Sequence, residues 1–122
     1  MSTILDTKQL DAVGFSKDGR TEMLLLLDHL DWSEEYEHLK LLQEKLNSYL
    51  WFIESGQAEM RRPKRIIPRA VRQYVIDIRF KYPPSENCLK FFDVVRQQAA
   101  GLKTEIRYQV TEPGTASQND AK

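Results

Sequence analysis

Apolar residues recur at helical spacing over residues 34–55, and this is the most regular pattern in the chain. They lie three or four positions apart, so they share one side of a helix. The stripe consists of Leu39, Leu42, Leu46, Tyr49, Leu50 and Ile53. The polar residues Lys40, Glu44, Lys45 and Asn47 mostly flank or oppose it. The pattern predicts an amphipathic helix whose leucine-rich side packs against the rest of the protein.

Both ends of this helix carry sequence signals. Asp31 and Ser33 are competent N-caps, and Asp31 with Glu34 three residues later forms a pair like a capping box. Gly56 supplies the expected C-terminal stop.

A second, shorter helix is predicted to begin after Ser85, its expected N-cap, and to end before Gly101. Its inward-facing residues are predicted to be Leu89, Phe92, Val95 and Ala99. Cys88 falls on the same apolar stripe, so we interpret it as a core cysteine rather than a nucleophile.

Four segments are predicted to be strands: residues 9–15, 21–28, 71–82 and 103–110. Asp18 and Gly19, between the first two, give a strong signal for a hairpin turn. The last two alternate between apolar and polar residues, as half-buried strands do. The second contains the run MLLLL, which presents apolar side chains on both faces of a sheet.

The order of elements is therefore ββαβαβ, and we expect an α+β two-layer sandwich in which a four-stranded sheet is backed by two helices. Residues 1–110 would form a single domain, and the polar tail 111–122 is predicted to be disordered. One face of the sheet would stay open, with Leu24 or Leu26 and also Val75 among charged residues. Because exposed apolar strips mark interaction sites, packing two such faces into a homodimer is the first hypothesis for this face.

Composition adds an expected compartment and an uneven distribution of charge. Net charge is zero, but residues 1–60 hold 12 acidic and 5 basic side chains, whereas residues 61–122 hold 6 acidic and 13 basic. The opposite charges of the two halves could compensate each other within the fold, or the acidic and basic surfaces could bind different partners or each other in a dimer. A single cysteine rules out an internal disulfide, and neither a secretion signal nor an apolar run near the ~20 residues of a membrane span is found. We expect a cytoplasmic protein.

One block of the sequence resembles a family of small bacterial proteins that carry a domain of unknown function. It starts with the DHLxW element at residues 28–32 and continues as EHLxLLQEKLNxYLxFIESGQ at residues 37–57. The resemblance covers roughly residues 10–110. It implies a shared fold and a bacterial cytoplasmic setting, and it assigns no activity.

The densest group of chemically capable residues comprises Asp28, His29, Trp32 and His38. A sharp turn could bring both histidines near Asp28 or Asp31 as a metal set of two histidines and one carboxylate, and Asp28, His29 and His38 would then serve a metal- or small-molecule-dependent enzyme. Nine residues between histidines is not a recurrent ligand spacing such as HExxH, however, and no Gly-rich phosphate loop or GxSxG motif occurs. We therefore predict structural or partner-contact roles, and we assign no catalytic residue, metal or cofactor.

Six positive charges crowd into residues 61–72, among them Arg61, Arg62 and Arg65. Such a loop could neutralise the phosphates of a nucleic acid. The pI near 6.7 and the lack of stacking aromatics in the loop argue against this alternative.

The favoured hypothesis is a non-catalytic protein-interaction module that binds a protein partner or itself, such as an immunity or accessory protein in a bacterial operon. Its predicted contact residues are Asp28, His29, Trp32, His38, Arg61, Arg62 and Arg65.

Overall fold

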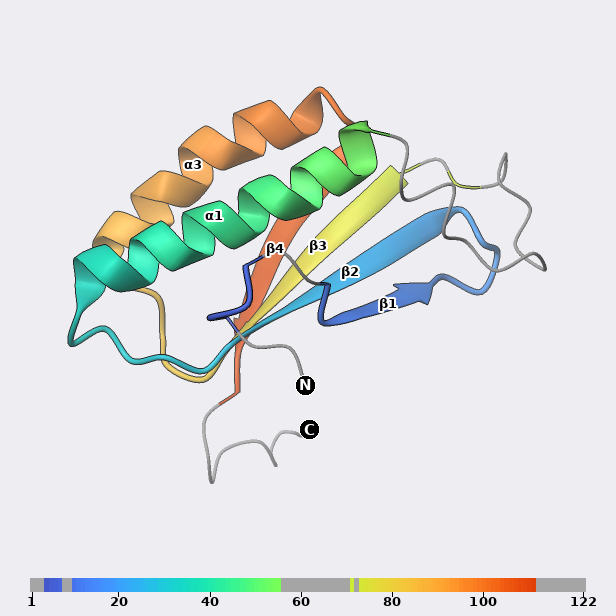
Figure 1. The fold of residues 1–122 in the computed structure, drawn as a ribbon. Coiled ribbons are helices and arrows are strands. Elements are labelled where there is room, and N and C mark those ends of the chain that lie inside the picture. The colour runs from blue at the N-terminus through green and yellow to red at the C-terminus, as the bar shows by residue number, and fades with distance from the viewer. Residues whose placement is uncertain (1–3, 8–9, 56–70, 72, 112–122) are drawn as a thin grey trace.

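The computed structural model describes residues 4–7, 10–55, 71 and 73–111, and these form two helices and one sheet (Figure 1). In chain order the elements are β1 (Ala12–Phe15), β2 (Thr21–Asp28), α1 (Glu35–Glu54), β3 (Gln73–Phe80), α3 (Glu86–Ala100) and β4 (Thr104–Val110). Both helices cover the same face of the four-stranded sheet (Figure 1). The predicted ββαβαβ order and the two-layer α+β architecture are confirmed.

The strands lie in the sheet in their chain order, β1-β2-β3-β4. β1 pairs antiparallel with β2, whereas β2 with β3 and β3 with β4 are parallel. Parallel neighbours need a crossover, and each helix supplies one. Two crossovers of the same hand that step the same way across a sheet place their helices on one face. The sheet therefore has an inner face under the helices and an outer face turned away from them.

The hairpin between β1 and β2 forms where the Asp-Gly signal predicted it. Gly19 has a φ of 74°, which glycine adopts without a steric cost. The Asp18 carboxylate accepts hydrogen bonds from the Ser16 hydroxyl at 2.7 Å and from the Arg20 N–H at 3.0 Å. Accepting the Ser16 hydroxyl is the main reason that the pKa of Asp18 is lowered. The first strand is shorter than predicted, since it starts at Ala12.

The predicted N-cap of α1 is wrong. The capping position is Glu34, and its side chain makes no capping hydrogen bond. The Asp31 carboxylate instead accepts from the N–H and the hydroxyl of Ser33, at 3.1 and 2.7 Å, which closes a turn before the helix and lowers the pKa of Asp31. Gly56, the predicted stop, lies outside the described residues.

The caps of α3 follow the prediction. The Ser85 hydroxyl accepts the Cys88 N–H at 3.2 Å, and Gly101 lies at the C-cap. The predicted inward face is wrong at one position, because Leu89 is exposed. Cys88 occupies the buried position and is fully enclosed, as expected of a core cysteine.

The core lies between the inner face of the sheet and the two helices. Leu24 and Leu26 of β2 are fully buried in it, so the expectation that one of them lies on the open face is wrong. Because strand side chains alternate, Met23, Leu25 and Leu27 occupy the outer face instead. A run of five consecutive apolar residues gives no signal for which alternate set faces the helices.

Candidate functional site

Three of the four clustered candidates from the sequence meet at the junction of β2 and α1. Asp28 ends β2 and His38 lies in the first turns of α1, and their side chains are almost completely buried. His38 Nε2 lies 2.5 Å from Asp28 Oδ2. The other oxygen of Asp28 accepts the Leu30 N–H at 3.1 Å. The contact joins the end of the strand to the start of the helix.

The second nitrogen of His38 also faces an oxygen. Nδ1 lies 2.9 Å from the main-chain carbonyl oxygen of Asp31, which can only accept, so Nδ1 carries a proton. One further proton lies between Nε2 and the Asp28 carboxyl group, on either side. In both arrangements the pair has no net charge, which avoids the cost of burying an isolated ion.

Trp32 covers this pair. Its ring stacks on the His38 imidazole with centroids 3.6 Å apart and planes at 20°, and it also lies 6.2 Å from the Phe80 ring. Its indole nitrogen is buried and has no hydrogen-bond partner among the described residues. His29 is exposed to solvent. The stacked ring fixes the connection between β2 and α1 against the core, a structural role for Trp32 and His38.

The metal alternative gains no support from this geometry. Within the part of the chain that the structure describes, no three His, Cys, Asp or Glu side chains are placed to hold a metal ion. Cys88 is also unsuited to act as a nucleophile there, because burial raises the pKa of its thiol to about 12, with the negative charges of Asp28 and Glu35 adding to the rise. Arg61, Arg62 and Arg65 lie outside the described residues.

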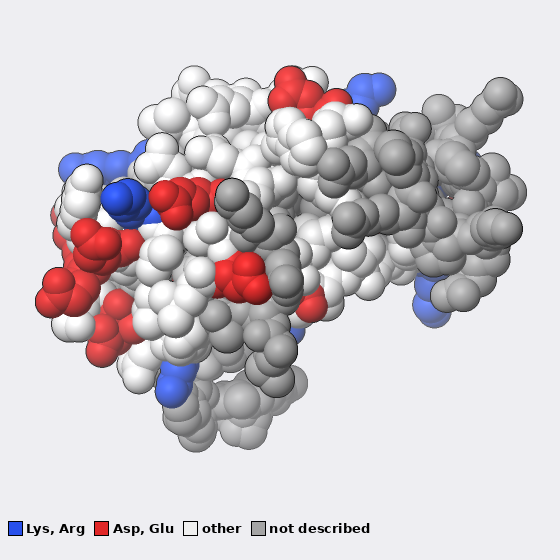
Figure 2. Space-filling view, in the orientation of Figure 1, with Lys and Arg blue, Asp and Glu red and all other residues white. Residues whose placement is uncertain are grey.

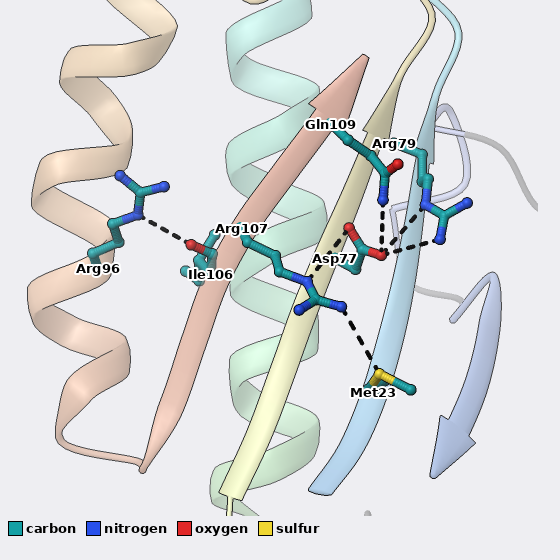
Figure 3. A network of polar contacts seen from close by, with 7 residues as sticks. All are labelled: Met23, Asp77, Arg79, Arg96, Ile106, Arg107 and Gln109. Atoms are coloured by element: carbon teal, nitrogen blue, oxygen red, sulfur yellow. Dashed lines mark hydrogen bonds and ion pairs between the residues drawn. The ribbon is translucent and has the colours of Figure 1, made fainter. Parts of the chain in front are cut away.

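The outer face of the sheet holds a second polar cluster, centred on Asp77 of β3 (Figure 3). Asp77 is only 6% exposed, although its carboxylate lies on the side away from the helices. Its Oδ2 accepts from Arg79 Nε and Nη2, both at 3.3 Å, and from Gln109 Nε2 at 3.5 Å. Arg107 Nε lies 3.9 Å from Oδ1, which accepts no hydrogen bond from the residues that the structure describes. We call these four residues the Asp77 cluster.

The two arginines of the Asp77 cluster are half exposed, at 43% for Arg79 and 49% for Arg107. The buried carboxylate therefore holds two guanidinium groups at the surface. Each guanidinium carries five N–H donors, and Asp77 engages only some of them. The cluster thus presents oriented hydrogen-bond donors on the outer face of the sheet.

Apolar side chains lie next to the Asp77 cluster on the same face. Arg107 Nη2 lies 4.0 Å from Met23 Sδ, and Leu25 and Leu27 continue the row along β2. Val75 also belongs to the outer face, as predicted, and is 4% exposed. The outer face is therefore apolar along β2 and, apart from Val75, polar across β3 and β4.

Sequence alternation predicted the face of each polar residue in the Asp77 cluster but not the cluster itself. The alternation in residues 71–82 places Asp77 and Arg79 on the polar side of that strand, and the alternation in residues 103–110 places Arg107 and Gln109 on the polar side of the other. Register supplies the missing step, because Asp77 lies directly opposite Arg107 in the β3–β4 pair. Without the strand order, no sequence signal places them together.

Carboxylates gather elsewhere, at the end of the molecule where α1 begins (Figure 2). The exposed acidic residues there include Asp31, Glu34 and Glu37. They face the positive end of the helix dipole, which favours negative charge.

A hollow of about 610 Å³ lies between the C-terminal ends of the two helices. Its most exposed apolar residue is Trp51, which is 56% exposed. The hollow has Asn47, Glu54 and Gln98 as polar lining. None of the predicted contact residues lines it.

Two helices on one face of a mixed four-stranded sheet, with a polar cluster on the other face, define a two-layer α+β domain. The chain belongs to the Family of unknown function (DUF6572), whose model matches residues 1–112. This confirms the resemblance found in the sequence. No curated protein and no solved structure matches the chain. Neither described helix is long and apolar enough to cross a membrane.

Proposed function

We propose that the protein is a non-catalytic interaction module that binds a protein partner through the outer face of its sheet. The observation that carries the proposal is the Asp77 cluster beside the apolar row of β2. The ion pairs between Asp77 and its half-exposed arginines contribute little to the stability of the fold, since an exposed ion pair is worth only ~0–1 kcal/mol. Their main effect is to orient the N–H donors of the arginines.

The two halves of the outer face supply complementary parts of an interface. Met23, Leu25 and Leu27 offer apolar area whose burial drives association. Arg79 and Arg107 offer donors whose orientation is already fixed by Asp77, which lowers the entropy lost on binding. Arginine is also enriched among the residues that dominate binding energies.

The partner is expected to carry an apolar patch opposite β2 and oxygen acceptors opposite the arginines. Glu105 lies on the same face, so the surface has mixed charge and does not resemble a phosphate-binding patch. A role as an immunity or accessory protein in the bacterial cytoplasm belongs to this proposal and rests on the small size and simple build of the domain.

The test compares partner capture by matched surface variants. The tagged full chain is used to recover its partner from the native host, and binding is then measured with the purified partner. Leu27→Asp places a charge in the apolar row, and Arg107→Lys keeps the charge but removes the planar fork. We expect both to weaken binding at least tenfold.

Val94→Asp is the matched control, because Val94 is an exposed residue of α3 and lies on the helix side of the molecule. Melting curves establish that all three variants fold. Unchanged binding by folded Leu27→Asp and Arg107→Lys, or equal loss with Val94→Asp, would refute the outer face as the binding surface.

A further inference from the structure

β4 is an edge strand that pairs only with β3 among the described strands. Lys103 O accepts the Tyr74 N–H at 3.0 Å, and the Thr111 N–H donates to Phe80 O at 2.7 Å. In a parallel ladder the alternate residues bond to the neighbour. The odd-numbered residues of β4 therefore bond to β3, and the even-numbered residues direct their N–H and C=O groups outward.

One outward group is already occupied. Arg96 of α3 donates its Nε–H to the carbonyl oxygen of Ile106 at 3.1 Å. Within the described chain, the outward backbone groups of Tyr108 and Val110 make no hydrogen bond. Their side chains are each 37% exposed, and Leu89 of α3, also exposed, adds apolar surface on the helix side. An unpaired edge of this length is a template for another strand.

We propose that β4 of a second copy of this chain pairs with this edge, antiparallel and related by a two-fold axis. In an antiparallel pair, two directly opposed residues either both form hydrogen bonds across the pair or both form none. The two-fold axis must therefore pass between a residue and the same residue of the second copy. The registers that keep most of β4 paired centre on Ile106, Arg107 or Tyr108. The choice among them depends on which side chains then face each other.

Charge complementarity selects the register centred on Ile106. It places Glu105 opposite Arg107 of the second copy, and symmetry repeats the pair. Centring on Arg107 would oppose two arginines, and centring on Tyr108 would oppose Arg107 and a glutamine. Opposite charges on directly facing residues stabilise a sheet, whereas like charges destabilise it. β4 is thus complementary to itself, which identifies a second copy as the occupant.

The structure leaves room for these new bonds. The Ile106 carbonyl oxygen has two lone pairs, so it can keep Arg96 and accept a second donor. Arg107 is held to Asp77 only at 3.9 Å, so its guanidinium can also reach a carboxylate across the axis. The two sheets then continue into one, and the two outer faces lie on the same side. This inference does not depend on the proposed partner binding.

The test is the oligomeric state of the full chain, measured by sedimentation over a dilution series. We expect a monomer–dimer equilibrium that Glu105→Arg weakens about tenfold or more, because two attractive pairs become repulsive. The exchange Glu105→Arg with Arg107→Glu restores the opposed charges and is expected to restore dimerisation. Leu27→Asp, which tests partner binding, should leave the dimer intact.

A second pair of variants keeps the test decisive if the charge exchange does not fold. Tyr108→Pro removes an outward N–H and leaves the bonds to β3 intact. Tyr108→Val loses the same aromatic packing but keeps the N–H. We expect Tyr108→Pro to dimerise at least tenfold more weakly than Tyr108→Val. A monomer at every concentration, or a dimer that responds to neither Glu105→Arg nor Tyr108→Pro, would overturn the proposal.

Discussion

The buried ion pair between Lys45 and Asp11 offers a direct test of how the layers are joined. Lys45 Nζ lies 2.8 Å from Asp11 Oδ1, and the two side chains are 0% and 1% exposed. Asp11 Oδ2 also accepts the Leu27 N–H at 2.7 Å. The hydroxyl of Tyr49 accepts the Asp11 N–H at 3.0 Å and donates to the Leu25 carbonyl at 2.6 Å. The pair therefore connects α1 to β2 and to the start of β1.

Lys45→Met should destabilise the protein by about 3 kcal/mol. Removing one partner of a buried pair typically costs about 3–5 kcal/mol, since the remaining charge is left without compensation. We expect a loss at the lower end of this range, because the Leu27 N–H still donates a hydrogen bond to the Asp11 carboxylate. Small domains have a total stability of only about 5–15 kcal/mol. With a urea slope of about 1–3 kcal/mol/M, the midpoint should fall by roughly 1–3 M.

The assay is urea unfolding of Lys45→Met, Asp11→Asn and the double variant. Each single change breaks the pair and leaves one of its members in the core, whereas the double change removes both, so the double variant should be more stable than the sum of the single losses predicts, by about 2 kcal/mol. Lys40→Met, at an exposed position of the same helix, is the control and should stay within about 0.5 kcal/mol of the original. A loss below 1 kcal/mol for Lys45→Met, or purely additive losses, would refute the reasoning.

Two further changes probe α1. Leu46→Ala removes a fully buried side chain and should cost about 2–5 kcal/mol in thermal or urea unfolding; an unchanged melting curve would mean that the stripe is not part of the core. Burial raises the pKa of Tyr49 above its usual value near 10, so the unfolded chain releases this proton first and stability should fall as pH rises past 10, by up to about 1.4 kcal/mol per pH unit. Tyr49→Phe should flatten that alkaline loss relative to the original chain, and equal slopes in the two proteins would contradict the assignment.

Much of the fold follows from local patterns. The leucine stripe places α1 within one residue of its observed ends, because helical spacing combined with burial leaves little freedom. The Asp-Gly turn predicts where β2 starts, because a hairpin turn sets the first residue of its second strand. The predicted strand, residues 21–28, matches the observed Thr21–Asp28. The order of the strands in the sheet does not follow from local patterns, because it depends on crossovers between distant segments.

Lys45 shows where pattern reasoning underestimates a buried charge. Charged residues usually lie on the solvated side of a helix, so Lys45 was assigned with the polar residues around the stripe. It nevertheless lies three residues after Leu42 and four before Tyr49, which places it within the stripe. Its partner Asp11 comes from a distant segment, and only the folded chain brings them together.

The N-cap error has a similar cause. A local rule favours Asp31 as the cap, but Asp31 closes a turn with Ser33 and its main-chain oxygen contacts His38. The His38 side chain also binds Asp28 at the end of β2. These longer-range contacts fix the connection before the helix and leave the capping position to Glu34.

Among the described residues, three carboxylates are buried in ion pairs, and they differ in how exposed their partners are. Enclosed partners indicate a structural pair, and exposed partners indicate the candidate interface. Asp28 and Asp11 face the helices, and their partners His38 and Lys45 are enclosed with them, so neither pair can meet another molecule without unfolding. Asp77 is nearly as buried, yet its arginines are about half exposed. A carboxylate on the outer face does not join the layers, because both described helices, α1 and α3, lie on the other side of the sheet. Its physical effect is to hold donors in fixed positions at the surface, which is the property that binding a partner requires.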